Sequence, residues 1–399
     1  MATRGEAIPL PVERVTEGPT YHFFGYYDKP CWNQSGRYIL AQESTFADRD
    51  PSGSDPLVIG IIARAEGNRF VPLSQTRAWN WQQGCLLRWM PPEQEHVFMY
   101  NDFRQGRYAC VSYDLRTKQK REWPWPVYDI TADGTMGVTG NFARVNTTRP
   151  GYGYACMPDP FAQETSPAGD GLYKLDLVGG GQRLIFSLAD ALEVGRVRPE
   201  KGHKAWFNHM TYNPSGTRML VFHRWAPHAV PGHVGFKSRL LTLNADGSKA
   251  VAPLEGMKIS HYSWLDYERI LIWLECPERD IFGYYLVHDP SGEMTPVGRG
   301  LFESDGHCNL SPDKRWMLTD RYPQDNPQQP LILYEMATNR RIDIGSFRSM
   351  TDMNTSFRCD LHTRWNSRGT QVCFDSTHEG TRQMYVIDVS TVTQGGKDR

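Results

Sequence analysis

The sequence predicts an all-β chain folded as a seven-bladed β-propeller. Three observations predict this fold: a histidine-and-turn unit that recurs along the chain, strand-like runs between the units, and no long stretch with a helical period. A supersecondary unit that recurs roughly every 40–55 residues is the sequence signature of propeller blades. Because a propeller grows by adding blades, the 399 residues are expected to form one domain.

Four of the repeated units begin with a histidine. An apolar or aromatic residue follows three positions later, then a polar turn, and then a β-rich run such as Arg218–Phe222. These units begin at His209, His261, His307 and His362. Because each histidine occupies the same place in its blade, the four side chains are expected to converge on the axis of the propeller.

Three upstream units have the same form without the histidine, and they complete a set of seven. They run over Lys29–Trp32, Leu86–Trp89 and Val127–Ile130. The step from Val127 to His209 exceeds its neighbours by about 30 residues, and a loop of that length on a propeller face usually shapes a binding site. We place this long loop insertion around 141–170. Residues 184–193 are predicted to form one short helix.

Composition narrows the classes of function. The net charge of −1 gives no electrostatic case for binding nucleic acid or an anionic membrane. The chain has no run of about 18 apolar residues, so we expect no transmembrane segment, and the N-terminus lacks the apolar core of a signal peptide. The eight cysteines show no Cys-x-x-Cys spacing, and we interpret them as buried thiols of a cytoplasmic protein.

Three of the histidines suggest a metal site. His261, His307 and His362 belong to three consecutive blades, and neutral imidazole is the commonest metal ligand. Three such ligands on a rigid wall leave coordination positions open for a substrate. The alternative is that these histidines only hydrogen-bond neighbouring backbone inside the channel.

His209 has a different setting, which suggests a base. It precedes the strand that contains His223 and Arg224, so the three residues are expected in adjacent strands of one blade. A nearby cation lowers the proton affinity of a histidine and favours its neutral form at pH 7. Arg224 is suited to hold a carboxylate through two parallel hydrogen bonds, with His223 beside it, and the alternative for Arg224 is a stack on Trp225 at the blade surface.

Further candidate residues for binding the substrate lie in the insertion and in a later blade. Cationic and aromatic side chains in the insertion offer clamps and stacking platforms for acidic sugars, although its Gly-Tyr-Gly-Tyr stretch also reads as a tight turn with packed rings. The substrate-binding candidates are Arg144, Arg149, Tyr152, His223 and Arg321. Four carboxylates invite a glycoside-hydrolase interpretation, but their spacing fixes no facing pair. They are Asp320, Asp360, Asp375 and Glu379.

Several phrases resemble the oligogalacturonate lyase-like group of seven-bladed propellers, which is related to the propeller lyases acting on ulvan and on rhamnosyl-glucuronate. The phrases are His22-Phe-Phe-Gly-Tyr-Tyr, Trp206-Phe-Asn-His209, Gly306-His307…Ser311-Pro-Asp and Asp360-Leu-His362…Phe374-Asp-Ser-Thr-His378-Glu-Gly. The resemblance implies β-elimination from a uronic acid, with a histidine base and a divalent cation held by histidines. By blade order it implies His209 as the base and His261, His307 and His362 as the metal shell.

The mechanism that this resemblance implies also needs a proton donor for the leaving oxygen, and His22 and Tyr154 are the candidates. The family's Gln-x-x-His-x-His cluster is replaced here by His307 with Cys308 and then His362, which leaves the metal open among manganese, calcium and zinc. The predicted function is a carbon–oxygen lyase acting on an acidic, uronate-containing oligosaccharide. Two other classes stay open: a non-catalytic propeller that binds a glycan or a protein, and a metal-assisted glycan hydrolase.

Overall fold

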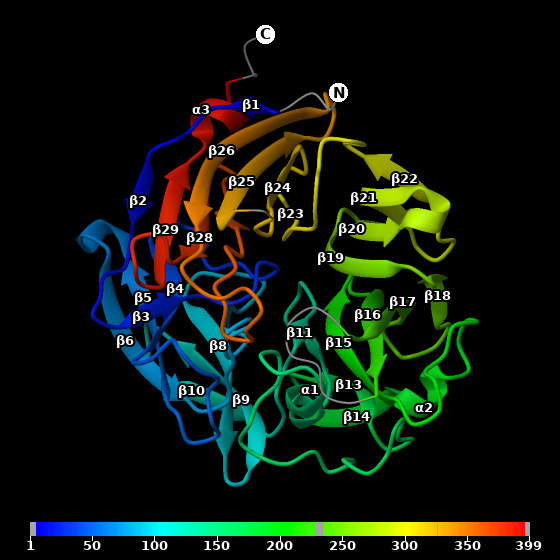
Figure 1. Cartoon of the computed structure of the whole chain (residues 1–399). Helices are drawn as coiled ribbons and strands as arrows, with labels where there is room; N and C mark the ends of the chain where they lie inside the picture. Colours follow the sequence, from blue (N-terminus) through cyan, green and yellow to red (C-terminus); the bar gives the residue numbers. More distant parts are fainter. Residues whose placement is uncertain (1–4, 228–234, 325, 396–399) are drawn as a thin grey trace.

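The computed structural model describes residues 5–227, 235–324 and 326–395, which form seven sheets arranged as a ring. Figure 1 is a view along the axis of the ring and shows the sheets radiating from its centre, as the blades of a propeller do. The predicted fold is therefore confirmed. Each predicted turn unit lies on or close to the innermost strand of a blade, just before the turn into the second strand.

The blades are described in chain order, each from its innermost strand outward. The first blade contains β3 (Tyr21–Phe23), β4 (Tyr38–Ser44), β5 (Leu57–Ala63) and β6 (Arg69–Thr76). The second contains β7 (Arg88–Trp89), β8 (Val97–Arg104), β9 (Arg107–Asp114) and β10 (Lys120–Trp123). The third contains β11 (Asp129–Ile130), β12 (Met136–Thr139), β13 (Gly171–Asp176) and β14 (Gly181–Ser187). The fourth contains β15 (Lys204–Tyr212), β16 (Arg218–Ala226), β17 (Lys237–Asn244) and β18 (Val251–Leu254).

The last three blades follow the same order. The fifth contains β19 (Lys258–Trp264), β20 (Arg269–Cys276), β21 (Ile281–His288) and β22 (Met294–Val297). The sixth contains β23 (Asn309–Leu310), β24 (Trp316–Asp320), β25 (Gln328–Glu335) and β26 (Arg340–Arg348). The seventh contains β27 (Arg364–Trp365), β28 (Gln371–Ser376) and β29 (Gln383–Asp388).

The N-terminal segment closes the ring. β2 (Val12–Arg14) pairs antiparallel with β29 and forms the outermost strand of the seventh blade, and β1 (Glu6–Ala7) pairs parallel with β26. Figure 1 shows these blue strands beside the orange and red strands of the C-terminal part. The closure joins the first and last parts of the chain and protects two sheet edges that would otherwise be unpaired.

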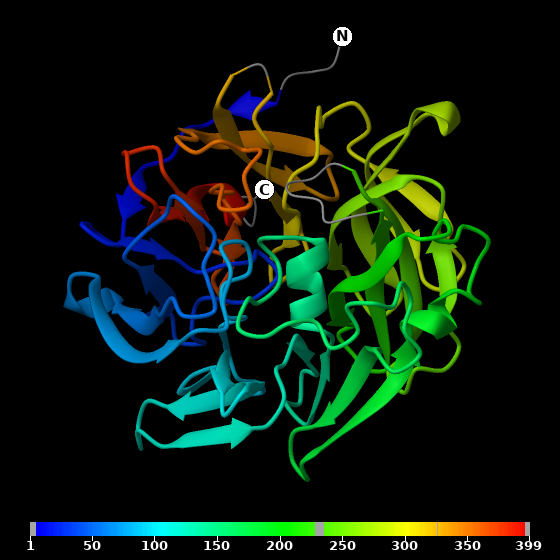
Figure 2. The same ribbon diagram turned by 60° about the horizontal axis from the view of Figure 1, so that its bottom comes forward.

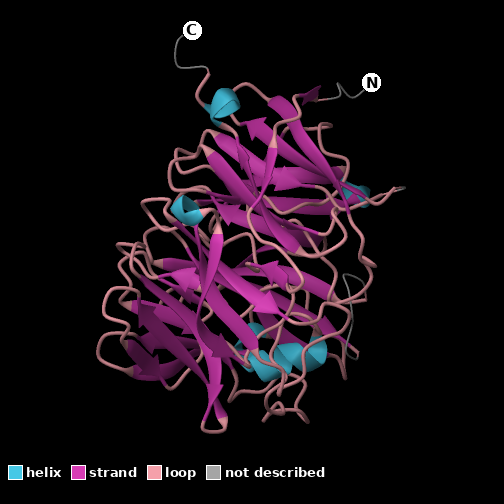
Figure 3. Cartoon of the chain, turned by 90° about the vertical axis from the view of Figure 1, so that its left-hand side faces the viewer, coloured by secondary structure: helices cyan, strands magenta, loops and turns pink. Residues whose placement is uncertain are grey.

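Helices are few and short, as Figure 3 shows from the side. They are α1 (Phe142–Thr148), α2 (Leu188–Ala191) and α3 (Ser390–Thr393), with 3-10 turns at Arg64–Glu66 and Pro277–Arg279. The helix predicted over 184–193 is only half right, because Leu184–Phe186 belong to β14, which pairs with β13. The helix α2 begins after Ser187, and the side chains of Ser187 and Asp190 cap it. No helix in the described ranges is long and apolar enough to cross a membrane.

The insertion between β12 and β13 is not a plain loop, because α1 begins it. Asn141 caps this helix by accepting a hydrogen bond from the backbone of Arg144, and most residues of the helix are buried. Figure 2 shows α1 near the middle of the ring, on the face turned toward the viewer. The predicted thiols are also observed: all eight cysteines are free and all except Cys156 are buried.

Candidate active site and metal centre

Two backbone irregularities place His209 and His261 in the channel. The pairing of β15 with β16 shifts register between Asn208 and Thr211, and the pairing of β19 with β20 shifts between Ile259 and Tyr262. Bulges of this kind re-aim a side chain and are common next to active sites. His209 has a φ of 55° and His362 a φ of 43°, a left-handed conformation that is uncommon for residues other than glycine.

The four histidines converge as predicted, and Tyr26 lies among them. Tyr26 belongs to the resembling phrase that begins at His22, but only His22 of that phrase was named as a candidate, so the central position of Tyr26 was missed. The ring centroid of Tyr26 lies 5.2 Å from that of His209, 6.5 Å from His261, 6.3 Å from His307 and 4.9 Å from His362. Four imidazoles and one phenol therefore share one buried centre.

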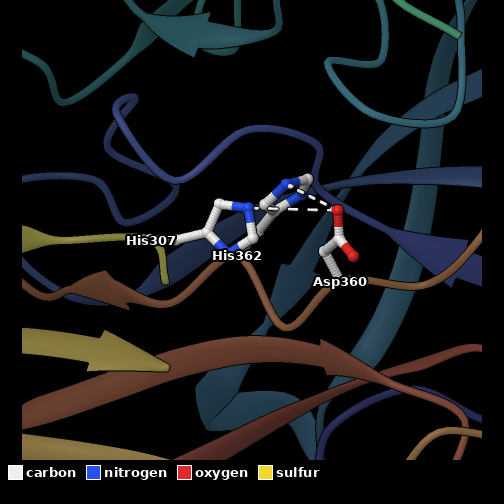
Figure 4. Close-up of side chains that lie close together, drawn as sticks. All are labelled: His307, Asp360 and His362. Atoms are coloured by element: carbon white, nitrogen blue, oxygen red, sulfur yellow. Dashed lines mark ion pairs between the residues drawn. The ribbon is translucent and has the colours of Figure 1, made fainter. Parts of the chain in front are cut away.

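His307, Asp360 and His362 form a group whose ligand atoms all lie within 4.8 Å of one another. Oδ2 of Asp360 is 3.9 Å from Nε2 of His307 and 3.8 Å from Nε2 of His362. Two atoms that each bind a cation at about 2.1 Å are at most about 4.2 Å apart, so these spacings suit one shared ion. Figure 4 shows both imidazoles directed at the Asp360 carboxylate.

The surroundings of this group also suit a metal. Nδ1 of His307 is 2.8 Å from Oδ2 of Asp320, which orients the ring so that Nε2 lies toward Asp360, with the hydroxyl of Tyr322 3.2 Å from the same nitrogen. Neither ring nitrogen of the buried His362 has a hydrogen-bond partner among the described residues. Burial and then His307 lower the pKa of His362 well below its ordinary value, so its imidazole is neutral and able to coordinate.

The predicted ligand His261 lies beside this group and is not part of it. Its ring centroid is 4.1 Å from that of His307, and its Nδ1 is 3.0 Å from Oδ1 of Asp305. Asp360 takes the third position instead, and its carboxylate is held by Arg358, whose Nε donates to Oδ1 over 3.1 Å. In the sequence, Asp360 was noted as one of four carboxylates and in the resembling phrase that begins with it, but not as a metal ligand.

A cavity of about 970 Å³ opens beside the histidines, a size that fits a small ligand. Its wall includes two predicted catalytic residues, His209 and Arg224, together with His261. Arg149 and Tyr152 of the insertion also line it, as do Tyr26, Tyr322 and Asp305. The insertion therefore contributes to the wall of the cavity, which is the role expected for it.

His209 is held as a buried, neutral imidazole. Its Nδ1 is 3.3 Å from the hydroxyl of Tyr128, and its ring stacks on Tyr26 at an interplanar angle of 22°. Burial lowers the pKa of His209 well below its ordinary value, and the positive charge of Arg224 lowers it further. The imidazole can therefore accept a proton at neutral pH.

Two guanidinium groups give one side of the cavity a positive charge. Arg224 lies over the rings of Phe222 and Phe236 at 5.0 and 4.8 Å, and its Nη1 has no hydrogen-bond partner among the described residues. Arg149 lies over Tyr152 and Phe236 at 4.8 and 4.7 Å. Burial lowers the pKa of Arg149 to about 10, which still leaves it charged at neutral pH. This wall is suited to bind an anionic group.

Both residues suggested as proton donors lie away from the cavity. Nδ1 of His22 is 3.1 Å from Gln383 and its Nε2 is 3.2 Å from Glu43, at the junction of the first and seventh blades. Tyr154 is fully buried, stacks on Phe142 at 4.3 Å, and accepts a hydrogen bond from Asn101. Neither side chain lines the cavity, so the structure corrects both assignments.

Three substrate-binding candidates also prove to have structural partners. The guanidinium of Arg144 pairs with Asp159 at 3.1 Å and donates to backbone carbonyls, so it anchors the insertion. His223 is fully buried and accepts a hydrogen bond from Nε of Arg239. Arg321 pairs with Glu303, a residue of the cavity wall, and does not line the cavity itself.

The buried pair of Arg144 with Asp159 leads to a stability prediction. Replacing Arg144 with methionine should lower the free energy of unfolding by about 3–5 kcal/mol, because it leaves a carboxylate in the interior without its cation. Chemical denaturation measures the change. The matched control is Arg104→Met, which breaks partly exposed pairs with Asp102 and Glu122 and should cost less than about 1 kcal/mol. Equal effects of the two substitutions would contradict the anchoring role.

The comparisons establish the fold. No protein-family model and no curated protein sequence matches the chain. An oligogalacturonate lyase from Vibrio parahaemolyticus is 16% identical with a TM-score of 0.64, over 97% of this chain and 99% of that one. An oligogalacturonate lyase in complex with manganese is 15% identical with a TM-score of 0.66, over 97% and 98%.

A propeller peptidase shares the fold as well. A structure from a study of two prolyl endopeptidases is 8% identical with a TM-score of 0.52, over 93% of this chain but 48% of that chain. The likeness to oligogalacturonate lyase differs in that it extends over nearly the whole of both chains. The structural resemblance that the sequence motifs indicated is thus confirmed at the level of the fold.

Proposed function

We propose that the protein is a metal-dependent lyase that cleaves a uronate-containing oligosaccharide by β-elimination. The observation that supports this most is the neutral base His209 on the wall of a cavity that adjoins the group His307, Asp360 and His362. The fold that the chain shares with oligogalacturonate lyases, one of them in complex with manganese, supports the same class of reaction.

The chemistry has three requirements. The negative charge of the uronate C6 carboxylate must be offset, the C5 proton must be removed, and the leaving oxygen must be protonated. A divalent cation bound by His307, Asp360 and His362 would supply the charge that makes the C5 proton acidic. Arg224 and Arg149 hold and orient anionic groups of the substrate, and His209 takes the C5 proton.

The ligand set favours manganese or zinc over calcium. Two imidazole nitrogens and one carboxylate oxygen suit manganese or zinc, whereas calcium is bound almost entirely by oxygen. Cys308 follows His307, but its thiol is not part of the group whose ligand atoms lie together. We therefore expect a site without sulfur ligands.

Arg224 gives a test of substrate binding. Arg224→Lys should raise KM for the oligosaccharide by about tenfold or more while changing kcat less, because lysine keeps the charge but cannot form two parallel hydrogen bonds. Steady-state kinetics measures KM and kcat separately. Arg37→Lys, at an exposed pair with Glu95, is the control and should leave both constants unchanged. An unchanged KM for Arg224→Lys would remove Arg224 from the binding wall.

The proposal as a whole is tested with a panel of uronate oligosaccharides, with added manganese and with a chelator. Elimination creates an unsaturated uronate that absorbs in the near ultraviolet, whereas hydrolysis does not. The near-ultraviolet absorbance should rise over time when manganese is present. This rise should stop when the chelator is added. New reducing ends without this absorbance would support the metal-assisted hydrolase, and binding without turnover of any substrate would support the non-catalytic propeller.

A further inference from the structure

The Tyr26 side chain lies at the centre of the histidine cluster, in the segment between β3 and β4, and lines the cavity. Only 3% of the residue is exposed. Its ring stacks on His209, with centroids 5.2 Å apart, and contacts His362 at 4.9 Å. Tyr26 therefore lies between the base and the metal-binding group. It adjoins the space that a substrate must occupy for these groups to act on the substrate.

The neighbouring tyrosine hydroxyls all have partners. Tyr152 accepts a hydrogen bond from Arg358 at 3.3 Å, and Tyr262 donates to the backbone carbonyl of His209 at 3.1 Å. The hydroxyl of Tyr128 contacts Gln83 and His209, and that of Tyr322 is 3.2 Å from Nε2 of His307. Among the described residues, the hydroxyl of Tyr26 has no hydrogen-bond partner, so its proton is available to a ligand in the cavity.

We propose that Tyr26 donates the proton to the leaving oxygen, and that it acts from the same side of the sugar as His209. This inference rests on the proposed function. His209 takes the C5 proton, the C4–O bond breaks as the C4–C5 double bond forms, and the leaving oxygen takes the phenolic proton. Solvent then returns a proton to Tyr26 and removes one from His209, so the enzyme is restored.

The stacking geometry places both groups on one face of the substrate. The two rings are nearly parallel, and centroids 5.2 Å apart leave no room for a sugar ring between them. A sugar in the cavity therefore meets His209 and Tyr26 on the same face. A base and an acid on one face require the C5 hydrogen and the C4 oxygen to lie on that face, which is a syn elimination.

This requirement defines the class of substrate. In a 4-linked uronate with the gluco configuration, the C5 hydrogen and the C4 oxygen lie on the same face of the ring. In the galacto configuration the C4 oxygen lies on the opposite face. The inferred substrate is therefore a gluco-configured uronate, which differs from the substrate named for the oligogalacturonate lyases of similar fold. In glycosidases, the distance between the two carboxylates predicts the stereochemical outcome of hydrolysis. In the same way, the placement of acid and base here predicts the configuration at C4 of the substrate.

The first experiment compares a 4-linked glucuronate disaccharide with its galacturonate C4 epimer. Both epimers give the same unsaturated product, so one near-ultraviolet measurement follows both. The wild-type enzyme should act on the gluco epimer faster by about tenfold or more. Faster elimination from the galacto epimer would overturn the inference while leaving the proposed function in place. Elimination from neither epimer nor from any other uronide would overturn the proposed function and, with it, this inference.

The second experiment uses Tyr26→Phe, which keeps the stacked ring and removes only the hydroxyl. Elimination should slow by about 10² or more, as expected for loss of a proton donor. Exchange of the C5 hydrogen with deuterium from D₂O should continue, because His209 is intact. Tyr267→Phe, at an exposed position, is the control and should behave as wild type. Near-normal elimination by Tyr26→Phe with an unchanged thermal midpoint would overturn the inference, as would loss of exchange and elimination together.

Discussion

Replacing His209 with alanine should lower kcat on a confirmed uronide substrate by about 10² to 10⁴, because a positioned base contributes that much to proton abstraction. The histidine is buried, neutral and on the cavity wall, and the charge of Arg224 contributes to lowering its pKa. Bound metal should be retained, since His209 is not in the group of His307, Asp360 and His362. Steady-state kinetics and metal analysis of the same protein sample measure both effects.

The control for this substitution is His288→Ala, which removes a partly exposed histidine at the end of β21, the third strand of the fifth blade. It should leave turnover and metal content unchanged. Near-normal turnover by His209→Ala would contradict the assignment of the base. Loss of metal from His209→Ala would show instead that this histidine is a ligand, and the base would then have to be sought among the remaining groups of the cavity wall.

Removing a metal ligand should have the second large effect. His307→Ala, His362→Ala and Asp360→Asn should each reduce the metal content from one cation per chain to near zero and abolish elimination. For His362→Ala the thermal midpoint should change little compared with the metal-free wild type, because neither ring nitrogen of His362 has a hydrogen-bond partner among the described residues. Elemental analysis and a thermal melt measure the two quantities.

His261 discriminates between the ligand set expected from sequence and the one that the structure shows. It lies outside the group, so His261→Ala should keep the cation with weaker affinity, through loss of the packing against His307. Complete loss of the cation from His261→Ala, with retention in Asp360→Asn, would contradict the structural assignment and restore the three-histidine site.

The sequence predicted the blades and the convergence of four histidines, because the repeat places equivalent residues at equivalent points of one closed ring. Asp360 was not identified as a ligand from the sequence. The phrase Asp360-Leu-His362 has the spacing of the family's His-x-His motif, with aspartate in place of the first histidine. This match could have indicated that Asp360 is a ligand. Nor could the pattern show that bulges in β15 and β19 re-aim His209 and His261, since a bulge depends on the pairing of two strands.

The errors in the candidate site have a common physical cause. Arg144 was taken as a substrate-binding residue and Tyr154 as a proton donor, because an arginine or a tyrosine in a long insertion can face a ligand or the interior. The structure turns both inward, where Asp159 and Asn101 satisfy them. Tyr154 and Asn101 are far apart in the sequence, so only the folded arrangement of the second and third blades brings them together. Tyr26 was missed for the same reason, because its partners come from four other blades.

The masses of the products formed from one pure uronate oligosaccharide test the central claim most directly. Elimination adds nothing to the substrate, so the account predicts that the product masses sum to the mass of the substrate and that one product carries the unsaturated uronate. The reaction should require the cation and should be lost in His209→Ala. Products whose masses together exceed that of the substrate by one water would show hydrolysis and contradict the account.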